Sequence, residues 1–143
     1  MSKGSILIVE DVSSIALSIR NNLESNGYEV AGQTDRGKDA IKKAGELHPN
    51  LVLMDISLSG EMDGIEAAKQ IRTMFDIPVI FLTAHTDPSI IELARNAEPY
   101  GYILKPFEER ELVIAIEMAL YKHDMEHKLR QSENKFRNVI EYA

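Results

Sequence analysis

The sequence predicts an α/β fold in which helices cover both faces of a parallel sheet. Apolar runs of strand length alternate with segments of helical period through roughly the first 120 residues. The runs are continuous rather than alternating, as expected for strands that are buried on both faces. Right-handed crossovers between parallel strands then place the connecting helices on both sides of the sheet.

Five runs are predicted to form the strands. The first contains only apolar residues after its opening serine, and the third stops at an aspartate. In chain order the predicted strands are Ser5–Val9, Tyr28–Ala31, Leu51–Met54, Pro78–Leu82 and Tyr100–Leu104. For a sheet of this size the common solution is the flavodoxin-like, doubly wound (βα)5 arrangement. Its strand order is 2-1-3-4-5, which we expect here.

The helices are predicted from apolar residues spaced three and four apart and from the signals at their ends. Asn26-Gly27 is a C-cap signal for the first helix, and His48-Pro49 ends the second. Asp87 is expected to cap the fourth helix, with Pro88 in its first position. The apolar stripes are Val12–Leu23, Ala40–Ala44, Ile65–Phe75 and Pro88–Ala94, and a long helix follows Lys105-Pro106.

Polar side chains stand at the carboxyl ends of four predicted strands. Ligands bind at this edge of a parallel sheet, near the point where the strand order reverses. The polar residues are Glu10 and Asp11 after the first strand, Asp55 after the third, Thr83 after the fourth and Lys105 after the fifth. Three carboxylates, a hydroxyl and an ammonium group are therefore expected to share one site.

The residue types at this site indicate phosphoryl chemistry. Neighbouring carboxylates repel one another, and a hard divalent cation relieves the repulsion. Mg²⁺ binds through one or two carboxylates plus phosphate oxygens, and Mn²⁺ also suits oxygen ligands. A carboxylate that stays free, Asp55, can act as a nucleophile and form an aspartyl phosphate. Lys105 and the metal would stabilise charge on the transferring group, while Thr83 donates a hydrogen bond to it.

Composition narrows the classes of function. The net charge of −7 repels polyphosphate backbones, so direct nucleic-acid binding is not expected. There is no cysteine for a thiolate metal site, and the longest apolar runs are far too short to span a membrane. The N-terminus lacks a signal-peptide pattern. We therefore expect a cytoplasmic protein that binds neither nucleic acid nor membrane.

Five short motifs resemble the receiver domain of two-component response regulators, the CheY-like family. They are Glu10-Asp11, Leu53-Met54-Asp55, Met62-Asp63-Gly64, Thr83-Ala84 and Tyr102-Ile103-Leu104-Lys105-Pro106-Phe107. The motifs occur in the family's order and at its spacing, which assigns residues 1–124 to a receiver domain. The resemblance implies a signalling switch rather than a turnover enzyme. Its phosphoryl group would come from a histidine kinase or a phosphotransfer protein.

The resemblance also implies a role for each residue of the acidic site. Asp55 resembles the phosphoacceptor, and Asp11 and Asp55 resemble the side chains that bind Mg²⁺ directly. Glu10 resembles a metal ligand that acts through water, and Ser57 matches the position whose backbone carbonyl completes the metal site. Lys105 resembles the lysine that pairs with the phosphoryl group.

Further roles follow from the same resemblance. Thr83 and Tyr102 resemble a switch pair, in which the hydroxyl moves toward the phosphoryl group and the ring turns inward. This movement would change the surface of helix four, strand five and helix five. Ser57 is two residues after Asp55, and His85 is two residues after Thr83. Both match positions that set the lifetime of the aspartyl phosphate in this family. The Lys105-Pro106 peptide bond is expected to be cis.

The same residue types also occur at strand ends for structural reasons or in a different class of enzyme. Asp11 could simply cap the first helix, and a threonine at the end of a strand is usually structural. One alternative function is a phosphatase of the haloacid dehalogenase type, which also uses Asp, Thr and Lys with Mg²⁺. That class expects an acid two residues after the nucleophile, where Ser57 stands. The other alternative is a pseudo-receiver that only binds partners.

The last helix is expected to continue past the receiver domain, as a linker over residues 125–143. Its seam residues recur at spacings of three and four, which favours a coiled coil and a homodimer over a solvated tail. They are Met118, Tyr121, Met125, Leu129, Ser132, Phe136 and Val139. Residues 129–141 resemble the first helix of a PAS sensor domain, which implies a receiver–PAS protein such as a hybrid sensor kinase. The face of helix four, strand five and helix five is a second candidate dimer surface.

Overall fold

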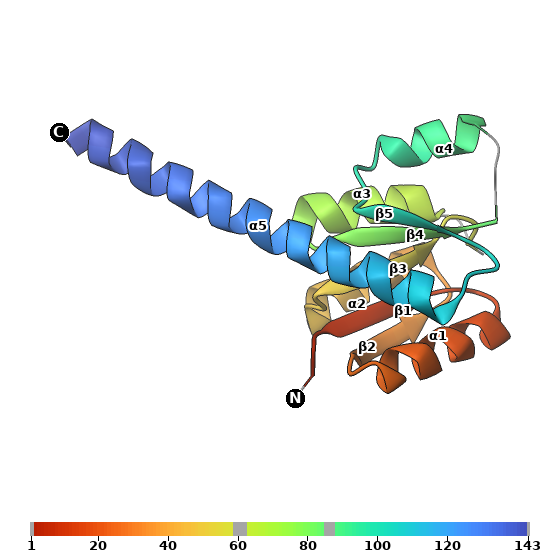
Figure 1. The fold of residues 1–143 in the computed structure, drawn as a ribbon. Coiled ribbons are helices and arrows are strands. Elements are labelled where there is room, and N and C mark those ends of the chain that lie inside the picture. The colour runs from red at the N-terminus through yellow and green to blue at the C-terminus, as the bar shows by residue number, and fades with distance from the viewer. Residues whose placement is uncertain (1, 59–62, 85–87, 143) are drawn as a thin grey trace.

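The computed structural model describes residues 2–58, 63–84 and 88–142, with side chains up to Glu133. A parallel sheet has the strand order β2-β1-β3-β4-β5, so the predicted fold and strand order are confirmed (Figure 1). The strands are β1 (Ser5–Val9), β2 (Glu29–Thr34), β3 (Leu51–Asp55), β4 (Val79–Thr83) and β5 (Gly101–Leu104). The order reverses between β1 and β3, which pair directly with each other.

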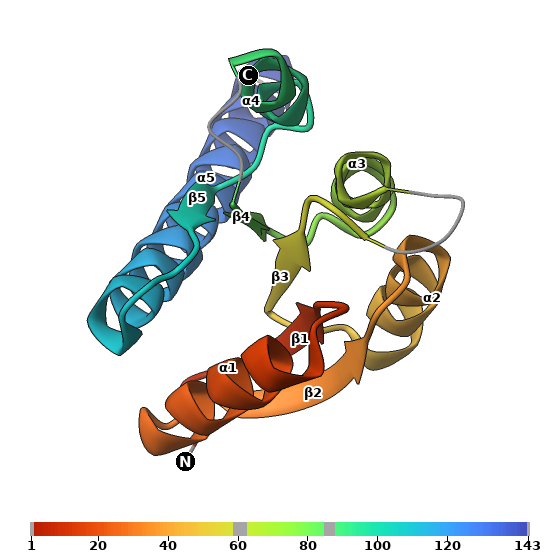
Figure 2. The ribbon, with the colours of Figure 1, turned by 90° about the vertical axis from the view of Figure 1, so that its right-hand side faces the viewer.

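A helix follows each strand. The helices are α1 (Ser13–Ser25), α2 (Gly37–Leu47), α3 (Gly64–Phe75), α4 (Pro88–Arg95) and α5 (Glu109–Tyr142). Figure 2 shows α1 and α5 on one face of the sheet and α2 and α3 on the other. The sheet is therefore the middle of three layers.

The core is divided by the alternation of side chains along each strand. Ile6 and Ile8 of β1 pack with α1 and α5, whereas Leu7 and Val9 pack with α2 and α3. All four side chains are fully buried. Burying an aliphatic side chain of this size contributes roughly 1.5–3 kcal/mol, so the two faces of β1 hold both outer layers to the sheet.

Some element boundaries differ from the sequence prediction. Strand β2 continues to Thr34, past the predicted end at Ala31, and its pairing with β1 shifts between Ile6 and Leu7, which leaves Ala31 of β2 as the extra residue of a bulge. Strand β3 includes Asp55, which the prediction placed just after the strand. The predicted sites at Met62, His85 and Asp87 lie outside the described residues.

Helix α5 is the long helix that the sequence predicts, and it runs without interruption across the proposed boundary at residues 124 and 125. Figure 1 shows its second half projecting beyond the other elements. The side chains of Phe136 and Val139, two predicted seam residues, lie outside the described part. Among the described residues, no helix has both the length and the apolar character that a membrane span needs.

Candidate functional site

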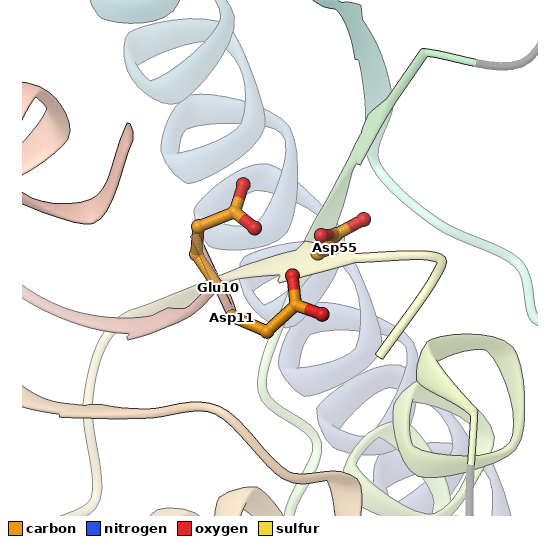
Figure 3. Close-up of side chains that lie close together, drawn as sticks. All are labelled: Glu10, Asp11 and Asp55. Carbon is orange, nitrogen blue, oxygen red and sulfur yellow. The ribbon is translucent and has the colours of Figure 1, made fainter. Parts of the chain in front are cut away.

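Three carboxylates meet at the carboxyl end of the sheet, where β1 and β3 lie side by side (Figure 3). Glu10 and Asp11 follow β1, and Asp55 is the last residue of β3. One oxygen of each carboxylate lies within 4.8 Å of the other two. Glu10 and Asp55 are only 2% and 5% exposed, whereas Asp11 is more accessible. The predicted convergence of these acids is therefore present.

Asp11 is not the N-cap residue of α1. The helix begins at Ser13, and its N-cap residue is Val12, which provides no side-chain hydrogen bond. The backbone N–H of Val12 instead donates to Oε2 of Glu10 at 3.3 Å. The loop after β1 thus orients Glu10, and the N-cap position falls one residue beyond Asp11.

The position of Asp55 depends on the backbone that surrounds it. The N–H of Ser57 donates to Oδ1 of Asp55 at 3.0 Å. Gly64, the first residue of α3, approaches so closely that an added Cβ would lie 2.0 Å from the carbonyl oxygen of Asp55. A side chain at this position therefore requires a backbone shift, which explains the glycine in the Asp63-Gly64 motif. Asp63 caps α3 by accepting a hydrogen bond from the N–H of Glu66 at 2.9 Å.

Lys105 reaches the acids from the end of β5. Its Nζ lies 2.5 Å from Oε1 of Glu10 and 3.2 Å from Oδ2 of Asp55. Its backbone N–H donates to the carbonyl of Thr83 at 2.9 Å, which fixes the loop against β4. The Lys105-Pro106 bond is cis, as expected. One ammonium group thus joins the acids of β1 and β3.

The electrostatics of this group follow from burial and proximity. Burial raises the pKa of Glu10, and the neighbouring Asp55 raises it further, while Lys105 counteracts part of the effect. Burial alone would lower the pKa of Lys105, but its pairing with Glu10 and Asp55 outweighs burial and raises that pKa. The site therefore holds Lys105 charged and disfavours ionisation of Glu10.

The donor set fits a divalent cation that prefers oxygen. Asp11 and Asp55 offer carboxylate oxygens from adjacent strands, which suits Mg²⁺. Oε1 of Glu10 is buried and faces the ammonium group of Lys105, which balances its charge in this structure. These residues can therefore hold Mg²⁺ at the acidic edge.

Thr83 and Tyr102 lie on neighbouring strands near the acids. Thr83 ends β4 and is 3% exposed, and the preceding residue, Leu82, pairs with Asp55. Tyr102 pairs with Phe81 in the sheet and its side chain is 41% exposed, with its ring centroid 6.2 Å from that of Phe81. Tyr102 therefore occupies an outward, partly exposed position in this structure.

Comparisons with known proteins agree with this geometry. A family model of the response regulator receiver domain matches residues 6–117. The chain is 38% identical over 116 residues to the transcriptional regulatory protein PdtaR of Mycobacterium tuberculosis, a match that covers 80% of this chain and 56% of PdtaR. The chain belongs to the response regulator receiver domain family.

Solved structures support the same assignment. The signal receiver domain of a modulated diguanylate cyclase from Desulfovibrio desulfuricans G20 matches with a TM-score of 0.83 and 38% identity, over 86% of this chain and 98% of that one. The N-terminal domain of a response regulator/sensory box/GGDEF 3-domain protein from Carboxydothermus hydrogenoformans also matches, with a TM-score of 0.78 and 41% identity. This match covers 85% of this chain and 98% of that one. The chain spans about half the length of the curated relatives it matches.

Family membership defines the general role of the chain. Receiver domains are the signalling switches of two-component systems, so the dehalogenase-type phosphatase is no longer supported. The sequence pattern does not predict that Lys105 pairs with Glu10 as well as with Asp55. Nor is the close approach of Gly64 to Asp55 among the sequence predictions. A glycine placed directly after a helix-capping aspartate was the available signal for that contact.

Proposed function

We propose that Asp55 accepts a phosphoryl group from the phosphohistidine of a histidine kinase or phosphotransfer protein. One observation carries this proposal. Asp55 is buried at the end of β3, is held by the N–H of Ser57 and by Lys105, and lies beside the acids that follow β1. A carboxylate fixed in this way can reach a partner's phosphoryl group without first being reoriented.

The transfer forms a bond between phosphorus and a carboxylate oxygen of Asp55. The bond to the donor's imidazole nitrogen breaks, and that nitrogen keeps the electron pair. When bound by Asp11, Asp55, the carbonyl of Ser57 and, through water, Glu10, Mg²⁺ would neutralise charge on the phosphoryl oxygens. Lys105 provides a second positive charge from the other side of Asp55, since it already lies 3.2 Å from Oδ2.

The response of the domain depends on the switch pair. Thr83 would donate its hydroxyl hydrogen to a phosphoryl oxygen, and Tyr102 would rotate from its exposed position toward the space that Thr83 vacates. Thr83 ends β4, which leads into α4, and Tyr102 lies in β5, which leads into α5. The added charge at Asp55 thereby biases the surface formed by α4, β5 and α5. We also propose that Ser57 and His85 set the lifetime of the phosphoryl group.

Acetyl phosphate tests the proposal without knowledge of the natural kinase. With Mg²⁺ present, intact-mass spectrometry should detect one added phosphoryl group per chain, and Asp55→Asn should gain none. Asp39→Asn, which changes a partly exposed aspartate of α2 away from the site, is the matched control and should behave as the wild type. Phosphoryl uptake by the Asp55→Asn variant would refute the assignment.

The same experiment separates the remaining alternatives. A switch keeps its phosphoryl group or releases it slowly, so inorganic phosphate should not exceed a few equivalents per chain during the assay. Continuous release would mean that the chain is a turnover enzyme. No uptake by a folded, Mg²⁺-saturated chain would favour a pseudo-receiver that only binds partners.

We propose that residues 125–143 connect the receiver domain to a PAS output domain in a cytoplasmic receiver–PAS protein. The solved relative from Carboxydothermus hydrogenoformans joins a response regulator to a sensory box, which supports this order of domains. Helix α5 already provides a continuous connection to residue 142. The net charge of −7 over all 143 residues gives the chain no attraction to nucleic acid, although some relatives are named as DNA-binding regulators.

The same helix is proposed to form a homodimer. Along α5 the apolar residues Met118, Tyr121, Met125 and Leu129 are 67%, 68%, 39% and 59% exposed, so a second copy of the helix would bury them. Met125→Glu should weaken such a dimer, and sedimentation of the full chain measures it. A monomer in both the free and the phosphorylated state would refute it, and a dimer unaffected by the substitution would point to the α4-β5-α5 surface instead.

A further inference from the structure

The face of α5 that packs on the sheet continues past the sheet as a row of polar residues. The buried residues of this face, in the core shared with α1, are Leu112, Ile116 and Ala119. At the next spacings of four, three and four along the chain stand His123, Glu126 and Arg130. Side chains at these spacings lie on one face of a helix, so the polar residues are directed toward the same side as the buried ones.

The first and last of these polar residues both contact Asp76, the C-cap residue of α3. Nε2 of His123 lies 2.8 Å from the backbone carbonyl oxygen of Asp76 and 3.5 Å from its Oδ1. Nη2 of Arg130 lies 3.4 Å from Oδ2 of the same carboxylate. One residue at the end of α3 therefore holds α5 at two positions that are two helical turns apart.

The middle polar residue contacts Tyr100, which directly precedes β5. The hydroxyl of Tyr100 donates a hydrogen bond to Oε2 of Glu126. The guanidinium carbon of Arg72, from α3, lies 4.6 Å from the centre of the Tyr100 ring, and the ring of His123 meets it edge-on. Burial and the Glu126 carboxylate raise the pKa of Tyr100, so the hydroxyl keeps the proton that it donates. Tyr100 thus joins α3 to α5.

These contacts are weaker than the apolar packing that precedes them in α5. The side chains of Asp76 and Arg130 are 49% and 56% exposed, and water screens ion pairs that are exposed to this degree. The same part of α5 also has pairs of its own, which stabilise a helix without help from the domain. They are Asp124 with Lys128 and His127 with Gln131, each 3.1 Å apart. Loss of the contacts to the domain would therefore leave the helix itself intact.

We propose that Asp76 and Tyr100 form a polar clamp on His123, Glu126 and Arg130 that sets the direction in which α5 leaves the domain. While the clamp is closed, α5 is part of the receiver domain as far as residue 130. When it opens, the helix swings as a rigid rod about Leu120, which still packs on the core. The effect on an output domain rests on the proposed receiver–PAS connection, whereas the clamp itself does not.

A distance between two spin labels tests the proposal in the full, unphosphorylated chain. The sequence contains no cysteine, so labels attached through Lys42→Cys in α2 and Glu133→Cys in α5, both at exposed positions, are unique. Double electron–electron resonance then gives the distribution of the distance between them, with labelled chains diluted in unlabelled ones. A swing of about 20° about Leu120 moves Glu133, roughly 20 Å further along the helix, by about 7 Å.

Two triple variants are compared with the wild type. The clamp variant combines His123→Ala, Glu126→Ala and Arg130→Ala, and it keeps the helix because alanine has the highest helix propensity. The matched control combines Asp124→Ala, His127→Ala and Lys128→Ala, which likewise removes an acid, a histidine and a base, but from pairs within α5. The wild type and the control should share one narrow distribution. In the clamp variant, the distribution should shift or widen by about 7 Å.

Three results would overturn the proposal. A wild-type distribution in the clamp variant would mean that packing on the sheet alone sets the direction of α5. An equal change in the control would trace the effect to the helix rather than to Asp76 and Tyr100. The third result comes from a milder pair of variants, since Glu126→Gln keeps an oxygen for Tyr100 and Glu126→Ala does not: equal distributions in the two would exclude the Tyr100 contact. None of these measurements involves phosphorylation, so the acetyl phosphate assay on Asp55 succeeds or fails independently.

Discussion

Replacing Lys105 with methionine removes the ammonium group that lies between Glu10 and Asp55. Most of the apolar stem remains, so the change is mainly one of charge. In the absence of metal, two buried carboxylates then face each other without a cation. We expect the variant to be clearly less stable than the wild type in EDTA, and to regain stability when Mg²⁺ is added.

The magnitude follows from the geometry of the pair. At 3.2 Å and an effective dielectric constant of about 20, the attraction between Lys105 and Asp55 is roughly 5 kcal/mol. The cost of removing both groups from water offsets much of this attraction, and removing one partner of a buried pair costs roughly 3–5 kcal/mol. The Lys105 side chain is 15% exposed, so the pair is not fully buried. We therefore expect Lys105→Met to lower the free energy of unfolding by about 2–3 kcal/mol, at or just below the lower end of that range.

Urea unfolding at neutral pH, with EDTA or with saturating Mg²⁺, measures this loss. Lys42→Met, at an exposed lysine of α2, is the matched control and should change stability by less than about 0.5 kcal/mol. The loss in Lys105→Met should shrink as the pH falls. Glu10 already has a raised pKa, from burial first and Asp55 second, so it takes up a proton early and no longer repels Asp55.

A double-mutant cycle provides the decisive comparison. If Glu10 and Lys105 interact as described, removing Lys105 should cost less in a Glu10→Gln background than in the wild type. If Lys105→Met alone loses less than about 0.5 kcal/mol of stability in EDTA, or if Mg²⁺ does not reduce its loss, then Lys105 does not balance the acids in the folded protein.

Three further predictions concern other contacts. Gly64→Ala should destabilise the domain by about 3 kcal/mol and slow phosphoryl uptake, because the Cβ meets the carbonyl of Asp55. At Gly101 an added Cβ would make only an ordinary contact with Ile80 at 4.0 Å, so Gly101→Ala is the control and should cost less than about 1 kcal/mol by urea unfolding. Mg²⁺ affinity should fall as the pH decreases through the raised pKa of Glu10, and Glu10→Gln should remove that part of the dependence in calorimetric titrations; an unchanged pH profile would contradict it. Tyr100→Phe should remove the hydrogen bond to Glu126 and cost about 1 kcal/mol, with faster amide exchange around that part of α5; equal exchange rates would refute this.

The sequence was sufficient for the fold because its signals are local and repeated. Continuous apolar runs, five predicted helices and short connections leave few arrangements of a parallel sheet, and the observed order is the expected one. The position of the acids followed from the same rule, since strand ends of a parallel sheet share an edge. Glu10, Asp11 and Asp55 therefore meet as predicted.

The contacts that the sequence did not predict depend on distances between elements. The sequence around Lys105 does not predict that its ammonium group pairs with Glu10. This contact depends on how far the ends of β1 and β5 extend relative to each other along the sheet. The contact between His123 of α5 and the backbone carbonyl of Asp76, at the end of α3, likewise depends on where α5 lies relative to α3. Periodicity fixes which face of a helix is buried, but it does not fix where the helix lies along the sheet.

The length of α5 gives small rotations a large effect. A helix of 34 residues is about 51 Å long, and its last ~16 residues lie beyond Glu126, which bonds to Tyr100 just before β5. A tilt of about 10° at that point would displace the far end by about 4 Å. Since Tyr102 stands two residues after Tyr100, the proposed rotation of its ring would act close to the point from which α5 projects.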